Sequence, residues 1–176
     1  MQTRYSAIAL VALVVLLGGY FLWSNAQSKR FDSNALELSF SYPKSYTISG
    51  HTEEGPERTW DVLVLQQEST TPPPQNSEGP PTISIIVLDN STGLTLENWI
   101  RGSAFSNFNL GGEVLASTTI GGEPALAYHY SGLYENDAVA VLHGTKIYFF
   151  SVGWLTEGDE IREDFRDILK SVVFAP

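Results

Sequence analysis

Cysteine is absent from the chain, and its absence removes several kinds of chemistry at once. Without a thiol, the chain forms no disulfide, builds no thiolate metal site and has no cysteine nucleophile. It also lacks the lipid-modified cysteine that holds bacterial lipoproteins on a membrane. An N-terminal lipid anchor of that kind is therefore excluded.

Basic residues are scarce relative to acidic ones. The chain has 10 Lys and Arg against 20 Asp and Glu, and its formal net charge is −10. A surface of this sign repels phosphate backbones, which argues against nucleic acid as a partner. It also offers no basic patch for anionic lipid headgroups.

The motifs that identify common enzyme classes are missing as well. The chain has no HExxH pair, no GxSxG turn and no glycine-rich loop that would cradle a phosphate. The sequence therefore predicts no cofactor and favours a non-enzymatic protein. The alternative is a hydrolase that acts on envelope material without a recognisable motif.

Charge is absent from one long stretch near the amino end, residues 6–23 (SAIALVALVVLLGGYFLW). A helix of that length spans roughly 27 Å, close to the thickness of the hydrocarbon layer. After a short tail of residues 1–5, this segment is predicted to be a transmembrane signal anchor. The alternative is a secretory signal cleaved near Ala26, which would release a soluble domain.

The anchor reading sets the expected domain organisation. Residues 24–34 are polar and predict a linker, and residues 35–176 predict one folded domain. Hydrophobic residues make up 43% of the chain, enough for a core. Short-tailed N-terminal anchors usually export the domain that they carry, so we expect an extracytoplasmic domain on a single-pass bacterial membrane protein.

Most of this domain shows strand patterns. Residues 36–42 alternate apolar and polar side chains, as in a half-buried strand. The stretches 60–67, 82–88 and 147–152 are apolar on both faces, which indicates strands covered above and below. Glycine turns predict two hairpins, listed with their strands: 113–120 with 124–130, and 137–142 with 146–154.

Two segments show helical spacing instead. Thr95 is placed to cap a helix that carries Leu96, Trp99 and Ile100 on one side. Residues 159–172 repeat apolar side chains every three or four positions, with acids in the first turns. The sequence therefore predicts an α+β fold: a mostly antiparallel sheet of about six strands, flanked by helices on both sides in an α/β/α sandwich.

The order of these elements and several short motifs resemble the PsbP-like fold, named for an extrinsic protein of photosystem II. The motifs are structural and cover most of residues 36–174. This resemblance implies a binding or assembly module, because relatives of that kind include photosystem assembly factors, a Ran-GTPase-binding protein and many anchored bacterial proteins. The motifs are Phe40–Pro43, Leu96–Ile100, Ile120–Tyr128, Lys146–Tyr148 and Asp164–Ser171.

Candidate metal ligands are few. His129, His143 and Asp137, with Glu135 nearby in the sequence, form a weak metal site if their strands bring them together. A histidine in a strand is more often a packed or surface residue, so the sequence favours no resident metal.

An exposed aromatic residue is the other candidate. Tyr134 lies in a predicted turn, residues 131–136, and is the residue we expect to contact a partner. Taken together, the sequence predicts a protein attached to the membrane by its N-terminal helix, with a protein partner of unknown identity.

Overall fold

The computed structural model describes residues 28–56, 59–68, 79–111 and 114–175. The expected tail of residues 1–5 and the expected anchor of residues 6–23 lie outside these ranges. Within the ranges, no helix is both long enough and apolar enough to cross a membrane.

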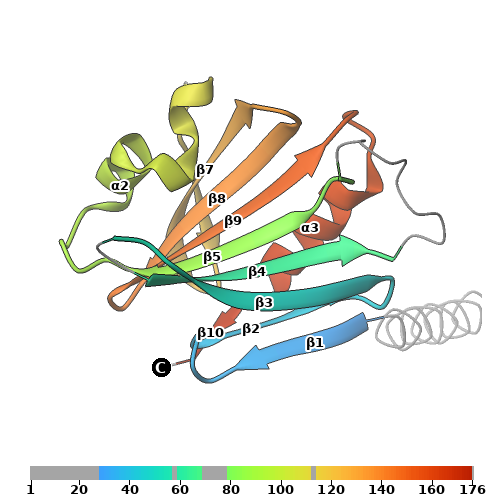
Figure 1. The fold of residues 1–176 in the computed structure, drawn as a ribbon, viewed down its shortest axis with the longest axis horizontal. Helices are drawn as coiled ribbons and strands as arrows, with labels where there is room; N and C mark the ends of the chain where they lie inside the picture. The colour runs from blue at the N-terminus through green and yellow to red at the C-terminus, as the bar shows by residue number, and fades with distance from the viewer. Residues whose placement is uncertain (1–27, 57–58, 69–78, 112–113, 176) are drawn as a thin grey trace, which may run out of the picture.

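Seven antiparallel strands form the main sheet (Figure 1), in the spatial order β3-β4-β5-β9-β8-β7-β6. Tight glycine turns join β6 to β7 and β8 to β9, where Gly121, Gly122 and Gly144 adopt positive φ angles that favour glycine. Both predicted hairpins are therefore confirmed. The strands are β3 (Tyr46–Glu54), β4 (Thr59–Gln67), β5 (Ile83–Asp89), β6 (Ala116–Ile120), β7 (Glu123–Ser131), β8 (Glu135–His143) and β9 (Lys146–Trp154).

A second, three-stranded sheet lies beside the main one and was not predicted. It consists of β1 (Ser28–Ser33), β2 (Leu38–Pro43) and β10 (Val173–Phe174), with β2 in the middle. The linker predicted for residues 24–34 is therefore wrong from Ser28 onward. The physical reason is Phe31, which stacks on Phe40 of β2 at 5.0 Å between ring centroids and draws this polar segment into the fold.

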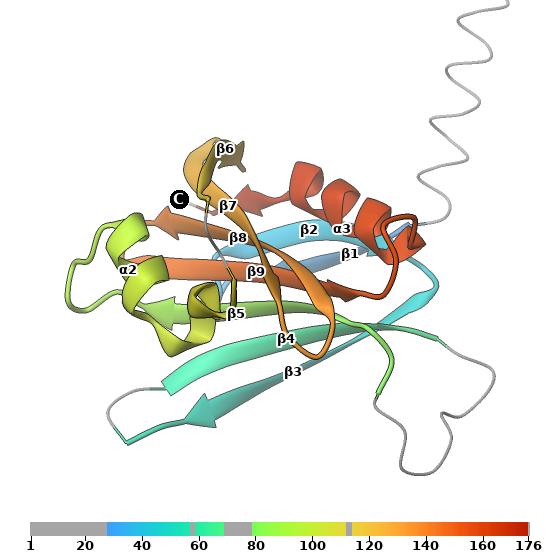
Figure 2. The ribbon, with the colours of Figure 1, turned by 90° about the horizontal axis from the view of Figure 1, so that it is seen from above.

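Helices cover opposite faces of the main sheet, as predicted (Figure 2). On one face, α3 (Glu160–Ser171) packs beside the small sheet. On the other lie α2 (Leu96–Gly102) and two short 3₁₀ turns, η1 (Ala104–Ser106) and η2 (Phe108–Leu110). The Thr95 side chain caps α2 by accepting a hydrogen bond from the Asn98 backbone N–H at 3.3 Å.

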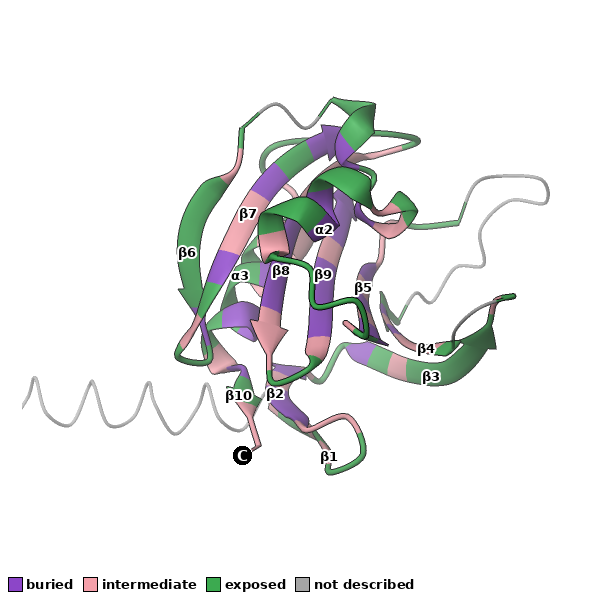
Figure 3. Cartoon of the chain, turned by 90° about the vertical axis from the view of Figure 1, so that its left-hand side faces the viewer, coloured by how far each residue is buried: buried purple, intermediate pink, exposed green. Residues whose placement is uncertain are grey.

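The core consists of two apolar layers separated by the main sheet. Strand β9 supplies both, because Tyr148 and Phe150 face α3 while Ile147 and Phe149 face α2. Its position at the centre of the seven strands matches the prediction made from its two apolar faces. Figure 3 shows the contrast between this buried centre and β6, which is exposed along most of its length.

Candidate functional site

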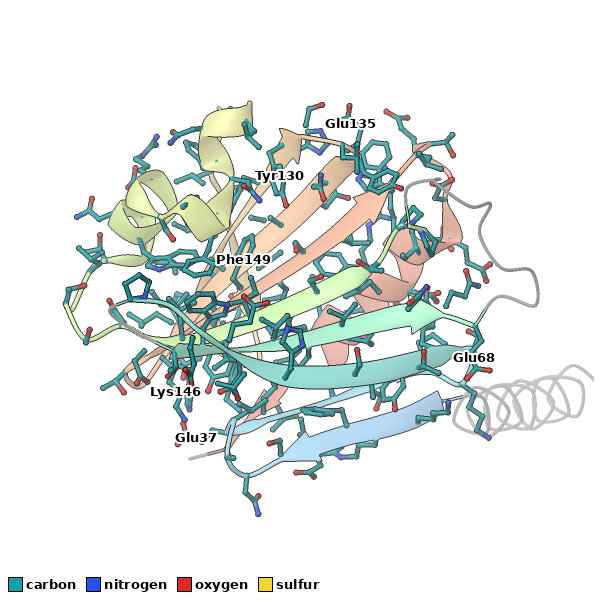
Figure 4. All side chains as sticks on the ribbon, viewed as in Figure 1. Glu37, Glu68, Tyr130, Glu135, Lys146 and Phe149 are labelled. Carbon is teal, nitrogen blue, oxygen red and sulfur yellow. The ribbon has the colours of Figure 1, made fainter. Side chains whose placement is uncertain are left out.

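A cluster of charged side chains joins the β7–β8 hairpin at the end where β8 begins (Figure 4). His129 lies directly opposite Asp137 in the strand register. Its Nδ1 is 3.3 Å from an Asp137 carboxylate oxygen, and its Nε2 is 2.8 Å from an oxygen of Glu135. The imidazole of His129 therefore lies between two carboxylates, both from β8.

Helix α3 adds a cation to this cluster. The Arg162 Nε donates a hydrogen bond to the other oxygen of Asp137 at 2.8 Å. The guanidinium lies 4.0 Å from the ring centroid of Trp154, a cation–π distance. Asp137 thus contacts side chains from two elements, and the cluster ties α3 to the sheet.

His143 lies far from this cluster. It stands opposite Lys146 in the register, and Figure 4 places Lys146 at the other end of the sheet from Glu135. Its Nδ1 is 2.9 Å from a Glu123 oxygen, and its Nε2 is 3.0 Å from the Ala175 carbonyl oxygen. The hydrogen bond with Glu123 raises the pKa of the imidazole.

The weak metal site considered from the sequence requires His143 to approach His129 and Asp137, and the fold keeps them apart. Six residues of extended strand separate Asp137 from His143, which is roughly 20 Å. Among the residues that the structure describes, no group of three or more potential ligands is arranged to hold a metal ion.

Tyr134 is half-buried in the β7–β8 turn. Its hydroxyl donates a hydrogen bond to the Gly79 carbonyl, and its ring packs over the backbone of Gly153. The neighbouring Leu133 is the more exposed side chain, at 69%. A partner contact through Tyr134 stays a prediction.

An open groove of about 440 Å³ runs between α3 and the β6 end of the sheet. Its floor comes from β6, β7 and β8, and its wall comes from α3. Ala116 and Ala127, paired in the strand register, leave the floor low at its middle. The lining residues are Val114, Ala116, Ala127, Tyr128, His129, Asp137, Ala138, Val139, Phe165, Arg166 and Leu169.

Most of this groove could not be predicted from the sequence. Ala116 and Ala127 are unremarkable in a strand pattern, and only their pairing beside α3 makes a hollow. The sequence signal that does exist is β6 itself, because residues 116–119 (ASTT) are small, uncharged and exposed.

A second groove, of about 560 Å³, lies at the start of α3. Its walls carry Glu68, Asp159 and Glu160 together with Pro80 and Pro81. Three acidic side chains line it, whereas small and apolar side chains line most of the groove beside β6. We therefore take the groove beside β6 as the candidate site.

One carboxyl group of α3 has a raised pKa and lies outside both grooves. Burial raises the pKa of Asp164, and the buried Tyr46 hydroxyl donates a hydrogen bond to it at 2.8 Å. Burial also raises the pKa of the Tyr46 phenol. The pair joins β3 to α3 and has a structural role.

The fold now places the chain in a class: it has the PsbP-like fold, as the sequence motifs suggested. The solution structure of cyanobacterial PsbP (CyanoP) from Synechocystis superposes with a TM-score of 0.55 and 15% identity, over 85% of this chain and 93% of that one. A crystal structure from Bacteroides thetaiotaomicron gives 0.51 and 10% identity, over 85% of this chain and 49% of that one.

At these identities the likeness establishes the fold alone. No family model matches the sequence, and no curated protein matches it either. Function must therefore be argued from the residues of the site.

Proposed function

We propose that this chain is a membrane-anchored, extracytoplasmic module that binds a protein partner and catalyses no reaction. The observation that carries the proposal is the groove between α3 and β6, where small and apolar side chains line most of an open hollow. The uncharged run of residues 6–23 supports the anchor, and fold analogy with PsbP supports a binding role.

The charged side chains at the end of the groove favour binding over chemistry. Asp137 pairs with His129 and Arg162, and Glu135 pairs with His129 and accepts from the Ser131 hydroxyl at 3.0 Å. These groups pair with one another and join α3 to the sheet, which gives them a structural role. The cluster holds the wall of the groove in place.

The shape of the groove favours a protein over a small molecule. Small-molecule sites usually enclose most of the ligand and converge several polar groups on it. Here the floor is shallow, and its rim continues into the exposed strand β6. A shallow apolar groove beside a sheet edge suits a segment of polypeptide.

The test is photo-crosslinking in the native membrane from a reactive amino acid placed at residue 114 of the full chain. Val114 lines the groove and is 74% exposed. Residue 173 is the matched control, because Val173 is also exposed, at 52%, and lies outside the groove. We expect one discrete protein adduct from 114 and none from 173, and equal patterns from both sites would contradict the proposal.

The anchor is tested in the same cells. We expect the full-length chain to stay with membranes through alkaline carbonate extraction and to leave them only in detergent. Intact chain in the soluble fraction, or a mature chain that starts near residue 27, would instead support the cleaved signal.

A further inference from the structure

Strand β6 ends the main sheet, so one side of its backbone faces outward. It pairs with β7 from Ala116 opposite Ala127 to Ile120 opposite Glu123, and no other described strand pairs with it. The outward N–H and C=O groups of such an edge strand are ready to pair with another chain.

The other long edges of the described sheets carry charges that oppose such pairing, whereas β6 carries none. The opposite edge of the main sheet is β3, and the C-terminal half of this strand contains His51, Glu53 and Glu54. The small sheet ends at β1, which holds Lys29, Arg30 and Asp32. Charged residues on edges are a common device against unwanted strand addition.

The hollow beside β6 would receive a side chain from an added strand. Ala116, Ala127 and Val139 form one row across β6, β7 and β8, on the face that α3 covers. A residue beside Ala116 on an added strand would extend this row. Because the two alanines are short, a large apolar side chain there can lean over them towards Phe165 and Leu169 on the wall.

One cation on the wall of the groove has no hydrogen-bond or ion-pair partner among the described residues. Arg166 is exposed and lines the groove, and it is the one Lys or Arg in the described ranges without a hydrogen bond or ion pair. In a chain of net charge −10, an exposed guanidinium on a groove wall suits a carboxylate.

We propose that β6 accepts an extended segment of the partner protein as an eighth strand of the main sheet. The segment places a large apolar side chain over Ala116 and Ala127 and a carboxylate beside Arg166. This mode of recognition rests on the proposed function and specifies it: backbone hydrogen bonds to β6 provide binding, and the hollow and the arginine provide selectivity.

The test begins with the full-length chain purified in detergent and a display library of random 12-residue peptides. The strongest peptide is synthesised in three forms, one plain and one for each of the two registers in which alternate backbone nitrogens are methylated. We expect selected peptides to share a large apolar residue and an acidic residue. Methylation on the β6-facing register should weaken binding at least ten-fold, because it removes the donors that an added strand needs.

Paired variants locate the site. Ala116→Lys fills the hollow and should weaken the plain peptide at least ten-fold, whereas Ser117→Lys, exposed on the opposite face of β6, should change binding less than three-fold. Arg166→Glu should weaken binding of the plain peptide at least five-fold. Lys170→Glu, one turn further along α3, should weaken it less than two-fold. If circular dichroism shows that Ala116→Lys does not fold, the comparison of Arg166→Glu with Lys170→Glu still tests the site.

Amide hydrogen exchange gives the direct readout. Bound peptide should slow exchange at residues 116–120 and leave β3 unchanged. The proposal is overturned if no peptide is selected, if the paired variants bind alike, or if protection falls elsewhere. A concentration-dependent dimer that protects β6 without peptide would also overturn it, in favour of a second copy of the chain.

The two proposals fail in different ways. Adducts from residue 114 in membranes without protection of β6 would remove strand addition and leave the binding function. Absence of those adducts would remove the proposed function, whatever peptide binds in vitro.

Discussion

The bond between Tyr46 and Asp164 offers the sharpest test of how α3 is held on the sheet. Tyr46 is fully buried, and its hydroxyl donates to the carboxylate at 2.8 Å. Tyr46→Phe removes the donor and leaves a half-buried carboxylate without it. A hydrogen bond to a charged group contributes roughly 1.5–3 kcal/mol, so we expect a loss of about 2 kcal/mol in the free energy of unfolding. For a domain of this size, that loss lowers the melting temperature by about 4–8 °C.

The loss should depend on pH in a defined direction. Burial raises the pKa of Asp164, so its own contribution favours the folded state in acid and is lost as pH rises through the folded pKa. Tyr46→Phe removes the hydrogen bond that lowers this pKa and therefore raises it further. The variant should lose more stability as pH rises, and its deficit should shrink in acid towards the roughly 0.5–1.5 kcal/mol of a neutral hydrogen bond.

The assay is urea unfolding of the wild type, Tyr46→Phe, Asp164→Ala and the double variant at neutral pH and near pH ~4, close to the ordinary pKa of an aspartate and below the raised pKa of Asp164. Glu97→Ala is the control, because Glu97 is exposed on α2, pairs with Arg101 and is not among the charges that shift the pKa of Asp164. We expect a coupling energy of about 1–3 kcal/mol at neutral pH. A coupling near zero, or one that is equal at both pH values, would refute the reasoning.

Three further predictions concern His143, Gly121 and Trp154. His143→Gln should remove the stabilisation that the protonated imidazole gives the folded state below pH ~6.5, which is lost as pH rises through the raised pKa of His143. In urea unfolding, the difference in unfolding free energy between wild type and variant should therefore narrow with rising pH, and a constant difference would count against the prediction. Gly121→Ala should lower the free energy of unfolding by about 2 kcal/mol or more, because its Cβ would meet the Phe174 ring at 2.8 Å; Gly122→Ala, which has open space, should cost only the roughly 1 kcal/mol of backbone strain, and equal thermal melts would contradict the clash. Trp154→Phe should lower the free energy of unfolding by about 1–3 kcal/mol in chemical unfolding, because the smaller ring leaves a void and weakens the contact with Arg162, while the buried indole N–H has no hydrogen-bond partner to lose in the described structure; a loss above about 4 kcal/mol would contradict an unpaired N–H.

The sheet was largely predictable because its patterns are local. Gly121, Gly122 and Gly144 occupy turns that need positive φ, so the hairpins were visible in the sequence. The apolar run of β9 also predicted its central position correctly. Strand β1 was missed because its one large apolar residue, Phe31, lies among Lys29, Arg30 and Asp32. A single phenylalanine among charged residues gives no alternation of apolar and polar side chains that would predict a strand.

The candidate site was only partly predictable because it depends on contacts between distant segments. The proximity of His129, Glu135 and Asp137 follows from the β7–β8 turn, whereas the sequence grouped His129 with His143, which the register places at the far end of β8. The pairing of Asp137 with Arg162 requires the final placement of α3 on the sheet, 25 residues along the chain. The hollow over two alanines is a property of register and helix position together, and no single segment contains it.

The route by which the chain enters the domain has a mechanical consequence. A pull on residue 27 reaches the fold at Ser28, the first residue of a six-residue edge strand that pairs with β2 alone among the described strands. The first rung joins Ser28 to Pro43, which has no backbone N–H to offer. Tension should therefore break the hydrogen bonds between β1 and β2 one after another, beginning at Ser28. Strand β2 stays bound to α3 through the Ser171 hydroxyl, which accepts a hydrogen bond from the Ser41 N–H at 2.9 Å. If residues 6–23 anchor the chain as proposed, release of β1 would lengthen the connection to the membrane and leave the seven-stranded sheet intact.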